Sequence, residues 1–198
     1  MKVFSSPASP FGRKVAITAH MKGLADRVDI QTMKADADEN TNPLAKIPVL
    51  VTDDGTSIYD SPVICDYLDA QVAAPVLFPG DGDKRWKTLT LGALADGIIE
   101  AAILRVYEGR YRPEEKRVEA WVEMQQNKID KALDHLEPGP PEWDGTPDYG
   151  HITLACALGY LDFRHGGKWR AGHPNLVAWL DKFDAAVPAF KATTPPPA

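Results

Sequence analysis

The sequence predicts two domains of different class: an α/β domain built on a mixed four-stranded sheet, followed by an all-α domain. Strand and helix patterns alternate over residues 1–72, which predicts a small mixed sheet with helices packed on it. Residues 73–84 contain two prolines and two glycines, as is typical of a linker. Residues 85–198 show helical periodicity only, so the second domain is expected to contain helices alone.

The first domain begins with an expected strand at Lys2–Ser5, followed by an expected helix at Arg13–Lys22. Alternation of apolar and polar residues predicts a half-buried strand at Arg27–Met33. The next segment, Lys34–Ala45, is polar and irregular, so no element is expected there.

A β-hairpin and a helix complete the first domain. Two short β-rich runs, Val49–Thr52 and Ser57–Tyr59, are joined by Asp53-Asp54-Gly55, which is a strong hairpin signal. A helix is expected to start near Ser61, with Pro62 in its first turn.

Four helices are expected in the second domain, and the third of them is apolar nearly all round, which predicts a central buried helix. The expected helices are Arg85–Tyr111, Pro113–Glu137, Asp148–Arg164 and Pro174–Val187, with a proline-rich loop at Pro138–Pro147 and an extended tail after them.

Composition narrows the function classes. The chain has 198 residues, 44% of them hydrophobic and 25% charged, which is ordinary for a globular protein. The net charge is −6 and no basic stripe is present, so a nucleic-acid partner is not expected. No apolar run reaches about 18 residues and no secretory signal is visible, so we expect no membrane association and a cytoplasmic location.

The histidines and cysteines indicate neither a metal site nor a redox-active pair. The five histidines are scattered along the chain, so no metal site is expected. The only cysteines, Cys65 and Cys156, lie far apart in apolar helical patterns and are expected to be buried, reduced thiols.

Ser9 stands at the turn between the first expected strand and the first expected helix. Backbone N–H groups and the positive end of the helix dipole favour an anion at such a turn. Pro10 follows in the position where a first-turn proline is tolerated. The simpler interpretation is that Ser9 only caps the helix, and the turn alone does not decide between the two.

At two further turns, the sequence is also compatible with either an ordinary structural role or a ligand-binding role. A cis bond between Ile47 and Pro48 would turn the Ile47 backbone outward to pair with a peptide-like ligand, although most X–Pro bonds are trans. Asp60 and Ser61 form an ordinary N-cap pattern, but Asp60 could also bind an ammonium group while Ser61 and the helix N-terminus bind a carboxylate.

Taken together, these motifs resemble a known family. The segments that carry the resemblance are Ser9–Lys14, Asn42–Leu50, Tyr59–Pro62, Ala93–Ile98 and Ala155–Arg164. In this order and spacing they resemble the cytosolic glutathione transferases, in particular bacterial members of the serine type. The resemblance covers nearly the whole chain. It implies a thioredoxin-like N-terminal domain, glutathione as co-substrate, a homodimer and a role in detoxification.

The resemblance also implies roles for individual residues. Ser9 matches the residue that activates the glutathione sulfur, and Phe11 is counted among the residues that bind the substrates. Lys34, more than Lys46, lies where the glycyl carboxylate is held. The backbone of Ile47, ahead of a cis Pro48, would pair with the cysteinyl unit.

Further positions carry weaker or altered matches. Asp60 and Ser61 match the pair that binds the γ-glutamyl end, although the family more often has Glu in place of Asp60. Asp96 resembles an acidic residue that in some classes reaches glutathione in the partner subunit. The capping box of the buried helix is altered as well, because Asp148 is followed by His151, a poorer reciprocal partner.

A serine at this turn can supply the free energy needed to stabilise a thiolate at neutral pH. Lowering a thiol pKa from about 8.5 by about 2 units takes roughly 2.7 kcal/mol. A hydrogen bond to a charged acceptor supplies about 1.5–3 kcal/mol. The helix N-terminus adds about 0.3–1 kcal/mol, and Arg13 in the first turn is expected to add positive potential.

The sequence therefore predicts a glutathione transferase in which a Ser9-stabilised thiolate attacks a small, electrophilic and mostly apolar co-substrate. Leu104, Tyr107 and Tyr111 are candidates for its pocket but could equally belong to the core. Dithiol exchange is excluded at this site, because the segment Ser9–Gly12 has serine and glycine where a redox motif has cysteines. The alternative is a protein of the same fold that binds glutathione with negligible turnover.

Overall fold

Four short strands form one mixed sheet in the N-terminal part of the computed structural model, which describes residues 1–197. The strands are β1 (Lys2–Ser5), β2 (Asp29–Thr32), β3 (Val49–Val51) and β4 (Ser57–Ile58), in the order β2-β1-β3-β4. Strand β1 is parallel to β2, whereas β3 is antiparallel to both β1 and β4. The predicted mixed sheet is confirmed.

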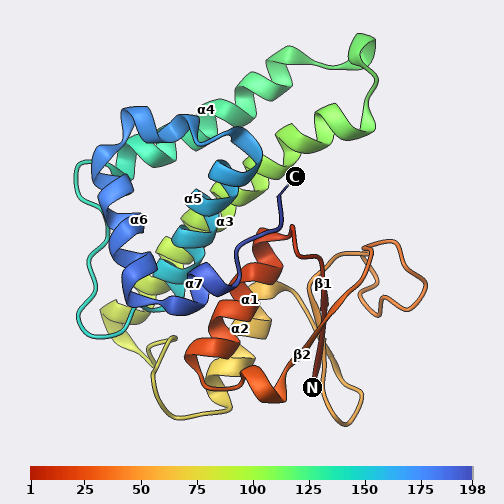
Figure 1. The fold of residues 1–198 in the computed structure, drawn as a ribbon, viewed down its shortest axis with the longest axis vertical. Coiled ribbons are helices and arrows are strands. Elements are labelled where there is room, and N and C mark those ends of the chain that lie inside the picture. Colours follow the sequence, from red (N-terminus) through yellow and green to blue (C-terminus); the bar gives the residue numbers. More distant parts are fainter. Residues whose placement is uncertain (198) are drawn as a thin grey trace.

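Helices α1 (Pro10–Met21) and α2 (Ser61–Ala70) cover the same side of this sheet (Figure 1). The side chains of Val3 and Leu50, which are register partners on β1 and β3, are fully buried. The first turn of α1 lies very close to β1 because Gly12 has no side chain. A Cβ atom on Gly12 would lie 1.9 Å from the Ser5 hydroxyl oxygen.

The second domain is helical, as predicted. Its helices are α3 (Gly82–Tyr111), α4 (Glu119–Leu136), α5 (Tyr149–His165), α6 (Pro174–Ala186) and α7 (Pro188–Ala192). Helix α5 is central, because every residue from 149 to 161 is buried and the helix packs against both α3 and α1. No helix within residues 1–197 combines the length and apolar character that crossing a membrane requires.

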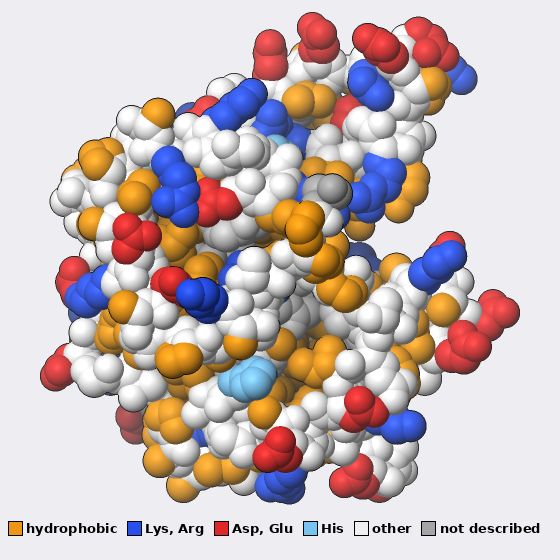
Figure 2. Space-filling view, in the orientation of Figure 1, with side chains coloured by type: hydrophobic (Ala, Val, Ile, Leu, Met, Phe, Trp, Pro, Cys, Tyr) orange, Lys and Arg blue, Asp and Glu red, His pale blue; other side chains and the backbone are white. Residues whose placement is uncertain are grey.

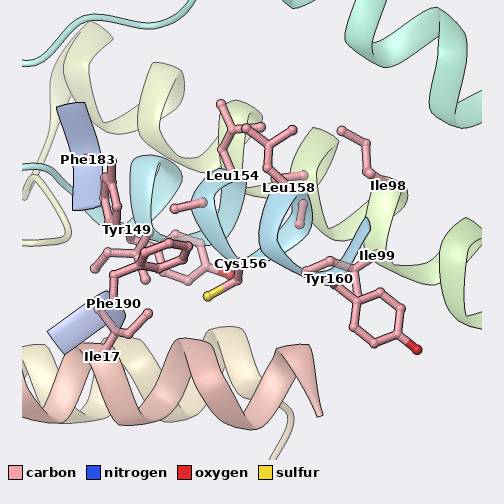
Figure 3. Close-up of a cluster of buried hydrophobic side chains, with 14 of the residues drawn as sticks. Ile17, Ile98, Ile99, Tyr149, Leu154, Cys156, Leu158, Tyr160, Phe183 and Phe190 are labelled. Atoms are coloured by element: carbon pink, nitrogen blue, oxygen red, sulfur yellow. The ribbon is translucent and has the colours of Figure 1, made fainter. Parts of the chain in front are cut away.

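The two domains share one hydrophobic core. Figure 3 shows α5 lying along α1, with Tyr149 near Ile17 and the Cys156 sulfur directed toward α1. The segment between the domains is also fixed, because the Asp69 carboxylate accepts hydrogen bonds from the backbone N–H groups of Leu77 and Phe78.

Several element boundaries differ from the prediction. Helix α1 starts at Pro10 rather than Arg13, and α3 starts at Gly82 rather than Arg85. Helix α4 starts at Glu119 rather than Pro113, because residues Glu114–Lys116 form a separate 3₁₀ turn. Strand β1 has the predicted bounds, whereas β2, β3 and β4 are shorter than expected by one to three residues; β2 is Asp29–Thr32 rather than Arg27–Met33.

The last expected helix is in fact two helices. Val187, predicted as its final residue, is extended (φ −126°, ψ 85°), and α7 begins at the next residue. The reason is local, since the residue before a proline is pushed out of the helical region while Pro188 itself suits a first helical turn.

Candidate functional site

The four segments singled out in the N-terminal domain leave the sheet at the same end. Register pairs Ser5 with Thr32, Phe4 with Val49, and Leu50 with Ile58. Strands β1, β2 and β4 run in one direction and β3 runs in the other. The C-terminal ends of β1, β2 and β4 therefore lie at the same edge of the sheet as the start of β3. This end of β1 points toward the helical domain (Figure 1).

Four candidate positions therefore form a row along this end of the sheet. In spatial order they are Lys34 after β2, Ser9 after β1, Ile47 before β3, and the pair Asp60-Ser61 after β4. The row has the shape of a site for an extended, peptide-like ligand with charged ends.

Ser9 caps α1 and keeps its own donor unused. Its hydroxyl oxygen accepts a hydrogen bond from the Gly12 N–H at 3.1 Å, and its backbone is extended. A hydroxyl has one O–H donor besides its two acceptor lone pairs, and the Ser9 O–H donates to no group within residues 1–197. The capping and anion-binding interpretations are thus compatible, since capping uses only an acceptor position.

Arg13 does not stand free beside Ser9, contrary to the expectation that it adds potential there. Its guanidinium is buried, donates to the Phe190 carbonyl at 2.6 Å and lies 3.9 Å from the centre of the Phe190 ring. Burial lowers its pKa, while Cys156 and nearby aspartates act in the opposite direction. The sequence shows the charge of Arg13 but not the helix α7 that binds it.

The peptide bond between Ile47 and Pro48 is cis. No hydrogen bond to the Ile47 backbone occurs within residues 1–197, so its N–H and C=O are free for a ligand. Pro48 is buried at the start of β3, where its missing N–H costs no ladder hydrogen bond.

Asp60 and Ser61 do not form the ordinary cap that the sequence allowed. Asp60 occupies the N-cap position of α2, but its carboxylate makes no capping hydrogen bond and is exposed. Ser61 is buried in the first helical turn. The arrangement leaves an exposed carboxylate beside the free N–H groups of a helix terminus.

The lysines at the other end of the row are both exposed. The Met33 N–H donates to the Ser5 carbonyl at 2.8 Å, so Lys34 follows immediately beyond the end of β1. A surface hollow of about 420 Å³ lies here, lined by residues of β1 and β2 together with Lys34 and Ala37. Lys46 lies on the irregular segment, where its carbonyl accepts a hydrogen bond from Asn40.

The cysteines play no part in this site. Both are free and fully buried, as predicted. Burial raises the pKa of Cys65 to about 12 and that of Cys156 to about 11, so neither offers a thiolate at neutral pH.

A buried network next to the site was missed by the sequence analysis. The Lys14 ammonium is fully buried and donates to Asp96 at 2.6 Å and to the Tyr149 hydroxyl at 3.1 Å. The Tyr149 hydroxyl in turn donates to the second Asp96 oxygen at 3.2 Å. Asp96 is therefore engaged within its own chain, and its contact with glutathione in a partner subunit, which the resemblance implied, stays a prediction.

The expected weakness of the α5 cap was wrong. Asp148 accepts hydrogen bonds from the Gly150 and His151 N–H groups, and the Asp148 N–H donates to His151 Nδ1 at 3.2 Å. His151 Nδ1 thus occupies the place that a glutamate carboxylate takes in a capping box, and it also lies 2.6 Å from Asp148 Oδ1, so the box is complete.

The three pocket candidates on α3 are not core residues. Leu104, Tyr107 and Tyr111 are 37%, 42% and 71% exposed. Phe11 is partly buried, with the Lys14 ammonium 5.5 Å from the centre of its ring.

Comparison with known proteins decides the family. Residues 3–76 match the profile of the glutathione S-transferase N-terminal domain, and residues 119–182 match that of the C-terminal domain. An Escherichia coli relative, the uncharacterized GST-like protein YibF, is 35% identical over 206 residues and covers all of both chains. The chain belongs to the glutathione S-transferase family.

Solved glutathione transferase structures agree over almost the full length. A family member from Pseudomonas fluorescens Pf-5 with bound glutathione is 42% identical with a TM-score of 0.90, over 98% of each chain. A structure from the same organism with bound S-(propanoic acid)-glutathione is 44% identical with a TM-score of 0.88, over 99% of this chain and 100% of that one. A glutathione S-transferase from Methylobacterium radiotolerans in complex with glutathione sulfonate is 33% identical with a TM-score of 0.87, over 100% and 95%.

Proposed function

We propose that this glutathione transferase family member is an active enzyme that binds glutathione along the end of the sheet and uses Ser9 to stabilise its thiolate. The observation that carries the proposal is the unused Ser9 donor at the N-terminus of α1, in the middle of a row of free polar groups. The Pseudomonas fluorescens and Methylobacterium radiotolerans relatives, crystallised with glutathione or its derivatives, support glutathione as the ligand.

Each part of the row would hold one part of the tripeptide. The γ-glutamyl amine would pair with Asp60 and its carboxylate with Ser61 and the start of α2. The free Ile47 backbone ahead of Pro48 would pair with the cysteinyl unit in β fashion. Lys34 would bind the glycyl carboxylate, with Phe11 close to the sulfur.

The energy needed for ionisation is available without Arg13. The Ser9 hydrogen bond to sulfur contributes about 1.5–3 kcal/mol, and the α1 N-terminus adds about 0.3–1 kcal/mol. Their sum covers the roughly 2.7 kcal/mol needed to lower the thiol pKa by about 2 units. The thiolate then attacks an electrophilic, mostly apolar co-substrate held between the domains, while the thiol proton passes to solvent.

The test compares two neighbouring serines. Ser9→Ala removes the proposed donor, whereas Ser6→Ala is the matched control, because Ser6 lies in the same loop and only accepts from the Ala8 N–H. With a chloronitrobenzene electrophile, kcat/KM should fall by about tenfold to a hundredfold in Ser9→Ala and stay near the wild-type value in Ser6→Ala. Glutathione affinity should change little in either variant.

Two outcomes would contradict the proposal. Tight retention of the wild type on immobilised glutathione, with equal, near-background rates for all three proteins, would identify a binding protein instead of an enzyme. Failure of the wild type to bind glutathione would remove both functions.

We also propose a homodimer as the functional unit, on family grounds. Large exposed side chains that a second copy could cover include Tyr59, Val63 and Trp86. Sedimentation analysis at micromolar concentration tests this proposal, since a single monomeric species would contradict it.

A further inference from the structure

Two arginines near the outer end of the α3–α5 pair form no ion pair within the part of the chain that the structure describes. Arg110 lies in the last turn of α3 and Arg164 in the last turn of α5, and neither forms an ion pair with any residue from 1 to 197. Their neighbours differ in this respect. Arg112 pairs with Glu108 at 3.1 Å, and Arg170 pairs with Asp162 at 2.6 Å.

Each arginine lies against an aromatic ring, Arg110 against Tyr107 and Arg164 against Phe163, and the Phe163 ring centre lies 6.4 Å from that of the buried Tyr160. Tyr160 is only 6% exposed, and burial raises its pKa, while the positive charges of Arg164 and Arg110 act against that rise. Tyr107 belongs to the same group, with the Arg110 guanidinium 5.8 Å from the centre of its ring. Arg164 is held over the Phe163 ring at 4.0 Å. We call Tyr107, Arg110, Tyr160 and Arg164 the arginine–tyrosine cluster.

This cluster lies toward the Ser9 end of α1. A Cβ atom on Gly159 would lie 2.5 Å from the Arg13 guanidinium, so α5 passes directly against the first turn of α1 there. The two helices run in opposite directions, since Tyr149 lies near Ile17 and Tyr160 lies at the other end of the contact (Figure 3). One turn back along α1 from Arg13 is Ser9, and one turn onward along α5 from Gly159 is Phe163.

The surface between the domains is hollowed on this side of the molecule. Figure 2 shows a notch between the helical domain and the sheet domain, with apolar side chains along it and Lys or Arg side chains above it, over the C-terminal half of α3. The half-exposed side chains of Leu104 and Tyr107 supply apolar surface on the same helix. The notch thus has apolar side chains along it and positively charged side chains above it, on the side of the helix that carries Arg110.

We propose that the arginine–tyrosine cluster binds an anionic group on the co-substrate, so that the preferred electrophile has an apolar body and a carboxylate at the end away from the reacting carbon. The inference rests on the proposed transferase function and deepens it. Guanidinium groups present paired donors that match a carboxylate, and the tyrosine hydroxyls add two neutral donors. The absence of an ion pair at Arg110 and Arg164 within residues 1–197 matters, because a carboxylate partner from the chain would compete for the same donors.

A matched pair of electrophiles isolates the carboxylate. In 4-chloro-3-nitrobenzoate and 4-chloro-3-nitrobenzamide, the glutathione sulfur attacks the ring carbon that carries chlorine. The C–S bond forms, the C–Cl bond breaks, and chloride leaves with the bonding electrons while the thiol proton goes to solvent. Each rate is divided by the uncatalysed rate with the same electrophile, which removes the difference in intrinsic reactivity.

The variants are Arg110→Gln and Arg164→Gln, with Arg110→Lys to retain charge and Lys131→Gln as the control. Lys131 is an exposed residue of α4, so its substitution changes the net charge equally but outside the cluster. We expect the benzoate-to-benzamide preference to fall about tenfold in each Arg→Gln variant. It should recover in part in Arg110→Lys and stay at the wild-type value in Lys131→Gln.

A binding measurement keeps the inference testable even without turnover. The S-aryl glutathione conjugates of the two electrophiles should differ in Kd for the wild type, with the carboxylate form tighter, and this difference should disappear in Arg110→Gln combined with Arg164→Gln. Equal preferences in wild type and both Arg→Gln variants, together with equal Kd values, would overturn the anionic subsite. The transferase proposal would survive that result if the benzamide is turned over in a Ser9-dependent way.

Discussion

Ser9 and Lys14 lie little more than one turn apart on the first helix, yet the chain treats their polar groups in opposite ways. Ser9 is half-buried, accepts one hydrogen bond and keeps its donor unused. Lys14 is fully buried and donates to both Asp96 and Tyr149. A polar group whose hydrogen bonds are made within the chain stabilises the fold, whereas a group with an unused donor at the surface is available to a ligand. The charge of Lys14 is therefore structural, and the neutral hydroxyl of Ser9 is the candidate for chemistry.

Breaking the buried network of Lys14, Asp96 and Tyr149 should have the largest effect on the free energy of unfolding. Asp96→Ala leaves the Lys14 ammonium buried without its counter-charge, which should lower the free energy of unfolding by about 3 kcal/mol, at the lower end of the range for buried pairs. The lower end is expected because the Asp96 side chain is 17% exposed. Urea denaturation measures the loss.

The double variant Lys14→Met/Asp96→Ala provides the control. Removing both charges should restore part of the lost stability, because no buried charge remains unpaired. A double variant that loses the sum of the two single effects would show that the two side chains act independently.

The close packing of α1 against β1 at Gly12, which positions Ser9, should be the next most sensitive to substitution. Gly12→Ala places a Cβ 1.9 Å from the Ser5 hydroxyl oxygen, so α1 or β1 must shift. We expect a loss of about 1–3 kcal/mol, together with reduced turnover. Thermal unfolding and kcat/KM check the two parts.

Gly97→Ala is the matched control, because Gly97 is also within a helix but a Cβ there meets no atom within 4 Å. That substitution should be neutral or stabilise the protein by roughly 0.5–1 kcal/mol. Equal destabilisation by both substitutions would remove the argument from close packing.

The N-caps of α1 and α5, one neutral and one charged, should contribute less to the free energy of unfolding than the features above. Asp148 is desolvated, which raises its pKa, but hydrogen bonds with His151 and Thr88 outweigh this and the net shift is downward. Its contribution of about 1 kcal/mol is present above the unfolded-state pKa near 3.9 and is lost as pH falls through the lower folded-state value.

Asp148→Asn should therefore be less stable than the wild type at neutral pH, and the difference should shrink below about pH 4. Urea denaturation at several pH values measures this, with Ser9→Ala as a neutral-cap control whose deficit stays constant. A deficit of Asp148→Asn that does not change with pH would contradict a role for the charge.

The sequence predicted the sheet and its turns because these depend on local signals. Alternating residues such as Val3 and Leu50 and the Asp54-Gly55 turn need no tertiary information. The end of the sheet at which the four site segments meet then follows from topology. Ser9 could be named from its turn, although whether its donor is free depends on geometry.

The remaining features depend on contacts between distant segments. A buried lysine contradicts every periodicity rule, so Lys14 could be found only through Asp96 and Tyr149, more than 80 residues away. The burial of Arg13 required helix α7, which is too short to give a periodic signal. Nothing in the sequence showed that Arg110 and Arg164 lie in the last turns of two helices that pack against each other.

The central claim, that the free Ser9 hydroxyl donates to the sulfur of bound glutathione, is tested most directly by the thiol pKa in the binary complex. Titration of thiolate absorbance should give a pKa about 2 units below that of a free thiol near 8.5 for the wild type and for Ser6→Ala. In Ser9→Ala the pKa should rise by about 1–2 units. An identical pKa in the wild type and Ser9→Ala, with glutathione bound to both, would contradict the account.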